Sequence, residues 1–143
     1  SAYRPGAAVN LERAMSAQGR FGGHMVQGHA DGTGVVTKAE KDMSGLRLAV
    51  ECSSELMRHV IAKGSVCVNG VSLTVVAEDG RSFDLYLIPE TIGRTNLTLL
   101  SAGDRVNIET DLVAKYLEKL LAGNKKAETD SSLLSALAEN GFM

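Results

Sequence analysis

The sequence predicts a mainly β protein that is built around one antiparallel barrel. Stretches of alternating apolar and polar residues recur between residues 24 and 111, and dipeptides typical of turns separate them. The chain has 143 residues with 15 glycines and only 2 prolines, which favours many tight turns. Short strands joined by such turns are typical of antiparallel barrels. We therefore expect residues 24–111 to form one closed or nearly closed barrel.

The first strands of this barrel lie between residues 24 and 51. Asp31-Gly32 and Gly34 interrupt the stretch 24–37, which predicts a turn or bulge between short strands. In the stretch 46–51, leucine and valine alternate with other residues, and this period of two indicates a half-buried strand.

The clearest hairpin lies between residues 66 and 75, around Asn69-Gly70. This dipeptide supplies the two positive φ angles of a type I′ turn. Asp79-Gly80 predicts a second turn, which leads into an alternating strand over 83–88. Pro89 has no N–H to donate to a sheet, so we expect this strand to end there. A last strand is predicted over 105–109.

Helices are predicted at three places. Ser53 and Ser54 can cap a short internal helix, of roughly 8–12 residues, that ends at Gly64. Thr110 or Asp111 can cap a second helix with a broad apolar stripe. Residues 123–129 are a polar linker, and Asp130 can cap a terminal helix. The stripe consists of Leu112, Val113, Tyr116, Leu117, Leu120 and Leu121.

Composition excludes several classes of function. The net charge is −2, aromatic residues make up 4% and tryptophan is absent, which argues against a nucleic-acid partner. No apolar run is long enough to span a membrane, and the first residues lack the pattern of a signal peptide. Cys52 and Cys67 form no zinc motif and are expected to be small apolar thiols in a reducing cytoplasm.

A short internal repeat relates the start of the chain to the last predicted strand of the barrel. Residues 6–12 match residues 103–109, and five of the seven positions are identical or pair Leu with Ile. Because the two segments are about one small β domain apart, residues 1–12 are interpreted as the final strand of a preceding copy. The predicted organisation is a remnant with its linker over 1–20, a barrel over 21–111, and C-terminal helices over 112–143.

Few residues suggest chemistry by themselves. His24 and His29 are five residues apart, on opposite faces of a regular strand, so a metal site is not expected. For His24 we expect a structural, half-buried ring that is hydrogen-bonded, while His29 is equally compatible with a structural and a functional role. Ser72 and Thr74 share one strand face, which is either the wet face of the sheet or the lining of a pocket. No nucleophile elbow, phosphate-binding loop or dinucleotide motif is present.

Taken together, a series of short motifs resembles the C-terminal half of the riboflavin synthases, a family of lumazine-binding tandem-barrel enzymes. Residues 9–14 resemble the end of the first barrel of that family, and residues 111–116 and 139–143 resemble its C-terminus. The motifs, in order, are Gly22-Gly23-His24 with Gly28-His29, Lys63-Gly64, Asn69-Gly70-Val71-Ser72-Leu73-Thr74-Val75, Leu87-Ile88-Pro89-Glu90-Thr91 and Val106-Asn107-Ile108-Glu109.

This resemblance implies a six-stranded Greek-key barrel and a homotrimer that assembles through the C-terminal helices. It also implies the dismutation of two molecules of 6,7-dimethyl-8-ribityllumazine to riboflavin and 5-amino-6-(ribitylamino)uracil, with neither metal nor organic cofactor. In this family each active site lies between the N-terminal barrel of one subunit and the C-terminal barrel of another. The chain would supply the C-terminal half-site only.

The resemblance also implies the residues of that half-site. His29, Ser72 and Lys63 would be catalytic, with His29 relaying a proton. Leu73 and Ile88 would pack against the faces of the heterocycle, while Ser72, Thr74 and Thr91 would hydrogen-bond its edges. The full set of expected substrate-binding residues is Gly28, His29, Ala30, Lys63, Ser72, Leu73, Thr74, Tyr86, Leu87, Ile88, Pro89, Glu90 and Thr91.

Two alternatives stay open beside the enzyme. One is a binding module of the same fold that carries lumazine or a flavin without chemistry. The other is a structural oligomerisation domain whose polar barrel face is merely solvated. Because most of the first barrel has no counterpart in these residues, we expect the chain to bind its ligand but to turn over slowly or not at all.

Overall fold

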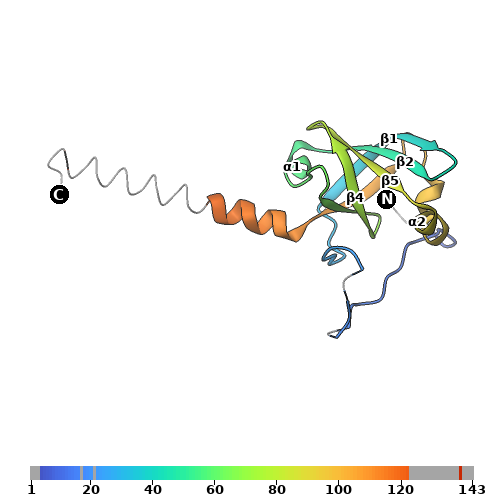
Figure 1. Cartoon of the computed structure of the whole chain (residues 1–143), viewed down its shortest axis with the longest axis horizontal. Coiled ribbons are helices and arrows are strands. Elements are labelled where there is room, and N and C mark those ends of the chain that lie inside the picture. The colour runs from blue at the N-terminus through green and yellow to red at the C-terminus, as the bar shows by residue number, and fades with distance from the viewer. Residues whose placement is uncertain (1–3, 17, 21, 123–138, 140–143) are drawn as a thin grey trace. The chain divides into compact units, whose positions relative to one another are not determined.

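The computed structural model describes residues 4–16, 18–20, 22–122 and 139. By its internal contacts the chain divides into two units, one ending at Asp111 and the other beginning at Leu112. The part up to Asp111 contains six strands, two short α-helices and one 3₁₀ helix (Figure 1). These elements are β1 Gly32–Lys41, β2 Leu46–Glu51, α1 Ser54–Met57, β3 Ser65–Val68, β4 Val71–Glu78, β5 Ser82–Leu87, α2 Pro89–Arg94, η1 Asn96–Leu99 and β6 Arg105–Thr110.

The strands close into one antiparallel barrel in the order β1-β2-β5-β4-β3-β6, with β6 pairing back onto β1. The registers are set by pairs such as Leu48↔Leu85 and Cys67↔Ser72. The prediction of a six-stranded antiparallel barrel within residues 24–111 is therefore confirmed. Closure gives every strand of the barrel a paired neighbour on both sides, so the barrel has no edge strand, which is the usual site of sheet-to-sheet association.

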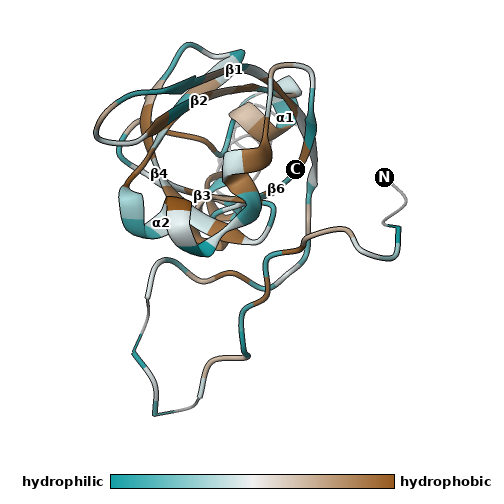
Figure 2. Cartoon of the chain, turned by 90° about the vertical axis from the view of Figure 1, so that its right-hand side faces the viewer, coloured by the Kyte–Doolittle hydropathy of each residue, from teal (hydrophilic) through white to brown (hydrophobic). Residues whose placement is uncertain are grey.

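The core fills the inside of this barrel. Apolar residues at alternate positions of each strand point inward and are almost completely buried, because the side-chain period of a strand is two. Hydrophobic segments accordingly follow the strands of the barrel wall in Figure 2. The largest fully buried side chains are Phe83, Leu48, Leu85, Leu87, Leu97 and Ile108.

The hairpin predicted around Asn69-Gly70 is confirmed. Asn69 has φ +48° and Gly70 has φ +81°, and β3 and β4 run antiparallel on either side of the turn. At the next turn the Asp79 carboxylate accepts hydrogen bonds from the backbone N–H groups of Arg81 and Ser82. These N–H groups hold the pKa of Asp79 below its usual value.

The predicted turn or bulge at Gly34 is wrong, because Gly34 lies inside β1. A Cβ atom at this position would come within 2.7 Å of both Val50 Cγ1 and Ile108 Cδ1, so the glycine is needed for close packing rather than for a turn. The irregularity in the β1–β2 ladder lies instead between Val36 and Lys38.

The internal helix after Ser53 is shorter than predicted. Ser53 caps α1 through a hydrogen bond from the Leu56 N–H to its hydroxyl, as expected, but α1 has four residues. Beyond it the chain makes i→i+3 bonds, such as Val60 N–H to the Met57 carbonyl, and Lys63 adopts φ +68°. These turns bring the chain back to β3. They also bury the side chain of Val60, which therefore does not need a longer helix.

The strand before Pro89 ends at Leu87, as predicted, but the short helix that follows was not expected. Pro89 occupies the first turn of α2, where its missing N–H costs nothing. Glu90 in the same turn forms an ion pair with Arg94 one turn later. Pro89 therefore ends one element and begins the next.

Residues 112–122 are helical, which confirms the helix predicted after Thr110. The predicted linker over 123–129 lies outside the described residues, and so does nearly all of the predicted terminal helix. No helix among the described residues is long and apolar enough to cross a membrane.

Candidate functional site

The segment before β1 is held against the outer face of the barrel. The carboxylate of Glu109 on β6 accepts hydrogen bonds from the backbone N–H of Gln27 at 2.6 Å and from that of Gly28 at 3.0 Å. Glu109 is almost fully buried by this contact, and two N–H donors satisfy its charge. Figure 2 shows this segment running outside the barrel wall. We call residues 8–28 the arm.

The neighbouring strand places Cys67 beside this carboxylate, since Cys67 pairs with Glu109 across β3 and β6. Burial, together with the negative charge of Glu109, raises the pKa of the Cys67 thiol to about 11. The thiol is therefore a small buried apolar group and is poorly suited to act as a nucleophile.

One strand further, the arm meets Ser72 on β4. The Ser72 hydroxyl lies 2.8 Å from Nδ1 of His24 and 3.4 Å from the backbone N of the same residue. A Cβ atom on Gly23 would come within 2.8 Å of the Ser72 Cβ, so only glycine allows the arm to approach β4 so closely. Nε2 of His24 is buried and has no hydrogen-bond partner among the described residues.

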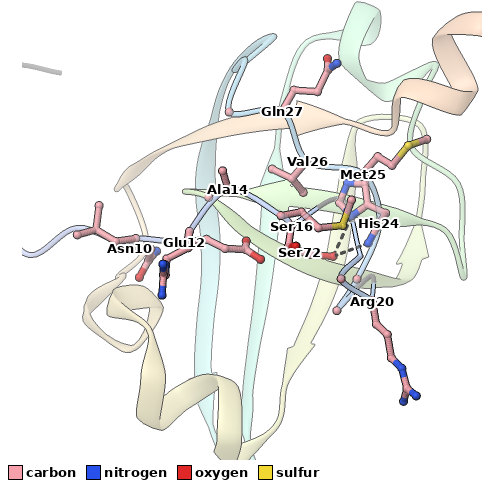
Figure 3. A pocket seen from close by; sticks show the side chains of 18 residues that line it. Asn10, Glu12, Ala14, Ser16, Arg20, His24, Met25, Val26, Gln27 and Ser72 are labelled. Carbon is pink, nitrogen blue, oxygen red and sulfur yellow. Dashed lines mark hydrogen bonds between the residues drawn. The ribbon is translucent and has the colours of Figure 1, made fainter.

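The arm surrounds most of an open hollow of about 830 Å³, and the barrel contributes Gly70 and Ser72 to its lining. Figure 3 shows His24 and Ser72 joined on one side of it and Asn10 and Glu12 on another. The lining combines apolar, amide, hydroxyl and charged groups, which suits a polar heterocycle. Its residues are Asn10, Leu11, Glu12, Arg13, Ala14, Met15, Ser16, Gly19, Arg20, Gly22, Gly23, His24, Met25, Val26, Gln27, Gly28, Gly70 and Ser72.

The other end of the arm is anchored by Asn10. Its amide donates to the carbonyl of Asn69 and to Oδ1 of Asn96, and its Oδ1 accepts from the Asn96 backbone N–H, each at 2.8 Å. Asn96 also donates to the carbonyl of Ala8 at 2.8 Å. The arm is thus fixed at both ends of the hollow, by Asn10 and by Glu109.

Strand β4 divides its expected site residues between the two sides of the barrel wall. Ser72 and Thr74 face outward, whereas Leu73 lies in the core with 8% exposure. The Leu73 side chain therefore cannot pack against a ligand outside the barrel. Lys63 borders the same strand, because its N–H donates to the carbonyl of Val75. Its side chain is exposed.

The residues at the end of β5 are divided in the same way. Leu87 is buried in the core. The Tyr86 hydroxyl donates a hydrogen bond to the carboxylate of Asp42 at 3.0 Å. Ile88 is 56% exposed, and it precedes Pro89, Glu90 and Thr91 in α2. Because β5 runs antiparallel to β4, this carboxyl end lies toward the end of β4 that carries Ser72. Ile88 and the start of α2 therefore border the same wall as Ser72.

The structure places His24, and not His29, against Ser72. His29 and Ala30 are exposed and do not line the hollow, while Gly28, directly before them, does. The expectation of a half-buried, hydrogen-bonded ring for His24 is met at Nδ1 and not at Nε2. No three His, Cys, Asp or Glu side chains gather in a metal-binding cluster within the described ranges.

The sequence analysis missed two features of the site, namely the contact of His24 with Ser72 and the role of Glu109. The contact of His24 with Ser72 depends on a glycine whose neighbour is distant in sequence, so no local pattern reveals it. Glu109 had a signal, because it stands at the same position as Glu12 in the internal repeat. A carboxylate that recurs at the end of an apolar strand suggests a shared structural partner, and the backbone of residues 27–28 is that partner for Glu109.

Curated relatives match nearly the whole chain. Riboflavin synthase of Actinobacillus pleuropneumoniae is 46% identical over 135 residues, which are 94% of this chain and 63% of the relative. Riboflavin synthase of Bacillus subtilis (strain 168) is 40% identical over 96% of this chain and 64% of the relative. The chain thus spans just under two thirds of the length of these two relatives.

Solved structures share the fold. LumP complexed with 6,7-dimethyl-8-(1'-D-ribityl) lumazine has a TM-score of 0.60 at 21% identity, over 63% of this chain and 51% of that one. LumP complexed with riboflavin has a TM-score of 0.60 at 22% identity, over 64% and 50%. The family model described as the lumazine binding domain matches residues 27–111, which include all six strands. The chain therefore belongs to the lumazine-binding domain family.

Proposed function

We propose that this barrel binds 6,7-dimethyl-8-ribityllumazine, or its product riboflavin, on the outer face of β4 beneath the arm. The observation that carries the proposal is the match of residues 27–111 to the lumazine binding domain, together with a hollow at the outward-facing Ser72. The likeness to riboflavin synthases over almost the whole chain supports the same ligand.

The exposed groups around β4 suit such a ligand. A flat heterocycle with carbonyl and ring-nitrogen edges needs hydroxyl and backbone partners and one apolar contact. Ser72 and Thr74 supply hydroxyls, Ile88 supplies an exposed apolar side chain, and Lys63 supplies a cation for a carbonyl or ribityl oxygen. Gly28 lines the hollow, and Thr91 in α2 supplies a further hydroxyl beside Ile88. Leu73 and Leu87 are buried within the barrel wall, and Tyr86 is bonded to Asp42.

For the chemistry, we propose that the chain supplies one half-site of riboflavin synthase. In the dismutation one lumazine gives a four-carbon unit to a second lumazine, and the two products together contain all atoms of the two substrates. The reaction therefore needs no external oxidant or reductant. Most of the acceleration comes from holding two reactants in the correct orientation, so one barrel binds but catalyses poorly by itself.

A fluorescence titration with riboflavin and with the lumazine tests binding, and chromatography of riboflavin formed from the lumazine tests turnover. Thr74→Val should weaken binding several-fold, since it removes one hydroxyl from the site. Thr37→Val is the matched control, because β1 is the strand opposite β4 in the barrel order. The absence of binding by the unaltered chain would refute the ligand assignment.

The same assay separates the enzyme half-site from a carrier of lumazine or flavin. Binding with slow riboflavin formation that rises with protein concentration supports a half-site, because two barrels must then meet. Binding with no riboflavin at any protein concentration supports a carrier. Turnover as fast as that of a full-length relative would contradict the claim that a second, different barrel is needed.

We also propose that the chain forms a homo-oligomer, a trimer on the family resemblance, through the helix at residues 112–122. Five apolar side chains of this helix are between 47% and 66% exposed: Val113, Tyr116, Leu117, Leu120 and Leu121. Such a stripe on one helix face needs a covering partner in water.

Light scattering on the purified chain tests this assembly. The double variant Leu117→Asp, Leu121→Asp should release monomers, because it places two charges in the apolar stripe. Lys119→Asp is the control, since it adds a carboxylate on the side of the helix opposite Leu117 and Leu121. A monomeric unaltered chain would contradict the proposed assembly.

Finally, we propose that residues 1–20 are the end of a preceding barrel and its linker, as the repeat between residues 6–12 and 103–109 suggests. Mass spectrometry of the native protein tests this, because it gives the length of the chain as the cell makes it.

The two cysteines, Cys52 and Cys67, are both free thiols, which fits a reducing cytoplasm as the location of the protein.

A further inference from the structure

The contact between His24 and Ser72 leaves the direction of its hydrogen bond open. If Nδ1 of His24 is unprotonated, the Ser72 hydroxyl donates to it and presents an acceptor to the hollow. If Nδ1 carries the proton, it donates to Ser72, and the hydroxyl is free to donate to a ligand. The N–H of His24, which lies 3.4 Å from Ser72 Oγ, points toward the same oxygen in both arrangements.

In catalytic triads, a third group that bonds the other ring nitrogen selects one tautomer. The other nitrogen of His24, Nε2, is buried and has no partner within the described part of the chain. Both tautomers leave this atom unsatisfied, so neither is favoured by a bond at Nε2. The described surroundings of His24 therefore do not fix the direction of the bond to Ser72.

We propose that His24 is a positioning residue that lets the Ser72 hydroxyl act either as donor or as acceptor toward the bound heterocycle. The inference rests on the proposed lumazine site. A ribityl-substituted ring offers both kinds of group: ring N–H and ribityl hydroxyls that donate, and carbonyl oxygens and ring nitrogens that accept. Without His24, the Ser72 hydroxyl would need another group to accept its proton whenever it accepts a hydrogen bond from the ligand.

The position of Ser72 supports this assignment over a purely structural one. Ser72 is a lining residue of the hollow and faces outward from β4, so a ligand there meets its hydroxyl directly. Gly23 holds the arm close enough for His24 to reach Ser72, and Glu109 fixes the arm at Gln27 and Gly28. The imidazole is therefore held in place at a residue that the ligand touches.

Variants at His24 test which ring nitrogen matters. An asparagine amide places an oxygen or a nitrogen near the Nδ1 position and can turn to offer either, whereas a glutamine amide reaches the Nε2 position. In a riboflavin titration we expect His24→Leu and His24→Gln to lose about tenfold in affinity, as for one hydrogen bond of about 1.4 kcal/mol. His24→Asn should stay within about threefold of the unaltered chain.

A double-mutant cycle with Ser72→Ala sharpens the test, because coupling shows whether His24 acts through Ser72. His24→Leu should cost almost nothing further once Ser72 is alanine. The control is His59→Leu, the same change at another half-buried histidine, which lies outside the hollow. If the leucine variant does not fold, the comparison of asparagine with glutamine gives the same information.

The outcomes separate this inference from the proposed function. Failure of the unaltered chain to bind riboflavin and the lumazine removes the site itself. Normal binding by the unaltered chain and equal binding by His24→Leu overturns the role of His24 alone. Equal losses for asparagine, glutamine and leucine, or a full loss for His24→Leu in the Ser72→Ala background, also overturn it.

Discussion

Residues 106–109 and residues 9–12 have almost the same sequence and opposite environments. In β6, Val106 and Ile108 are at most 1% exposed. At the equivalent places in the arm, Val9 is 48% and Leu11 is 90% exposed. Glu109 is buried beneath the arm, whereas Glu12 is exposed at the hollow.

The difference between the segments is the presence of pairing strands. β6 pairs with β1 on one side and with β3 on the other, so its alternation places valine and isoleucine inside a closed barrel. Residues 9–12 have no neighbouring strand within the described chain and are held by the side chain of Asn10 instead. The same pattern therefore contributes to a core only where two other strands receive it.

The largest expected effect comes from the isoleucine of the repeat. Ile108→Ala should lower the free energy of unfolding by about 2–5 kcal/mol, because it leaves a cavity in the barrel core. Leu11→Ala should change it by less than about 0.5 kcal/mol. Urea unfolding measures both, and similar losses in the two variants would show that the arm is part of the cooperative core.

Replacing the two glutamates of the repeat, Glu109 and Glu12, should also cost more stability in β6 than in the arm. Glu109→Ala removes the acceptor of the Gln27 and Gly28 N–H groups and should cost about 2–3 kcal/mol. Glu12→Ala should be close to neutral in stability. Hydrogen exchange at Gln27 and Gly28 reports on the contact directly. Unchanged protection of these two amides in Glu109→Ala would contradict the anchoring role.

Two glycines sharpen the comparison further. Gly34→Ala should destabilise the barrel by about 1–3 kcal/mol, because its Cβ would meet Val50 and Ile108. Gly22→Ala in the arm should be neutral, since a Cβ there has no heavy atom within 4 Å. Thermal unfolding checks both variants. A harmless Gly34→Ala would mean that the strand can move away from its neighbours.

The smallest effect concerns the Cys67 thiol, whose pKa is raised from 9.0 to about 11. The folded protein holds this proton more tightly than the unfolded chain does. The contribution of the thiol to the free energy of unfolding is therefore fully present below pH 9. It should fall as the pH rises from about 9 to 11. Cys67→Ala should lack this part of the fall, as measured by urea midpoints between pH 8 and 11. If both proteins lose stability alike, the thiol does not contribute.

The candidate site was predicted only in part. Ser72 and Thr74 were placed on one face from their spacing, and both do face outward. Leu73 and Leu87 were expected at a ligand, but they point into the core, because a barrel gives every second residue to its interior. His24 was expected to be structural and proves to be the histidine at Ser72. Contacts between the arm and β4 join residues 48 apart in sequence, which no local pattern encodes.

The sequence by itself determined the fold class, most of the strands and the turns at Asn69-Gly70 and Asp79-Gly80, because side-chain period and turn chemistry are local properties. Asn69-Gly70 forms its turn wherever the hairpin lies, and Pro89 ends a strand through its own missing N–H. Only the tertiary structure decided which copy of the repeat became core, which histidine reached Ser72, and which carboxylate anchored the arm. Each of these depends on a partner far away in the chain, and such partners are specified only when the barrel closes.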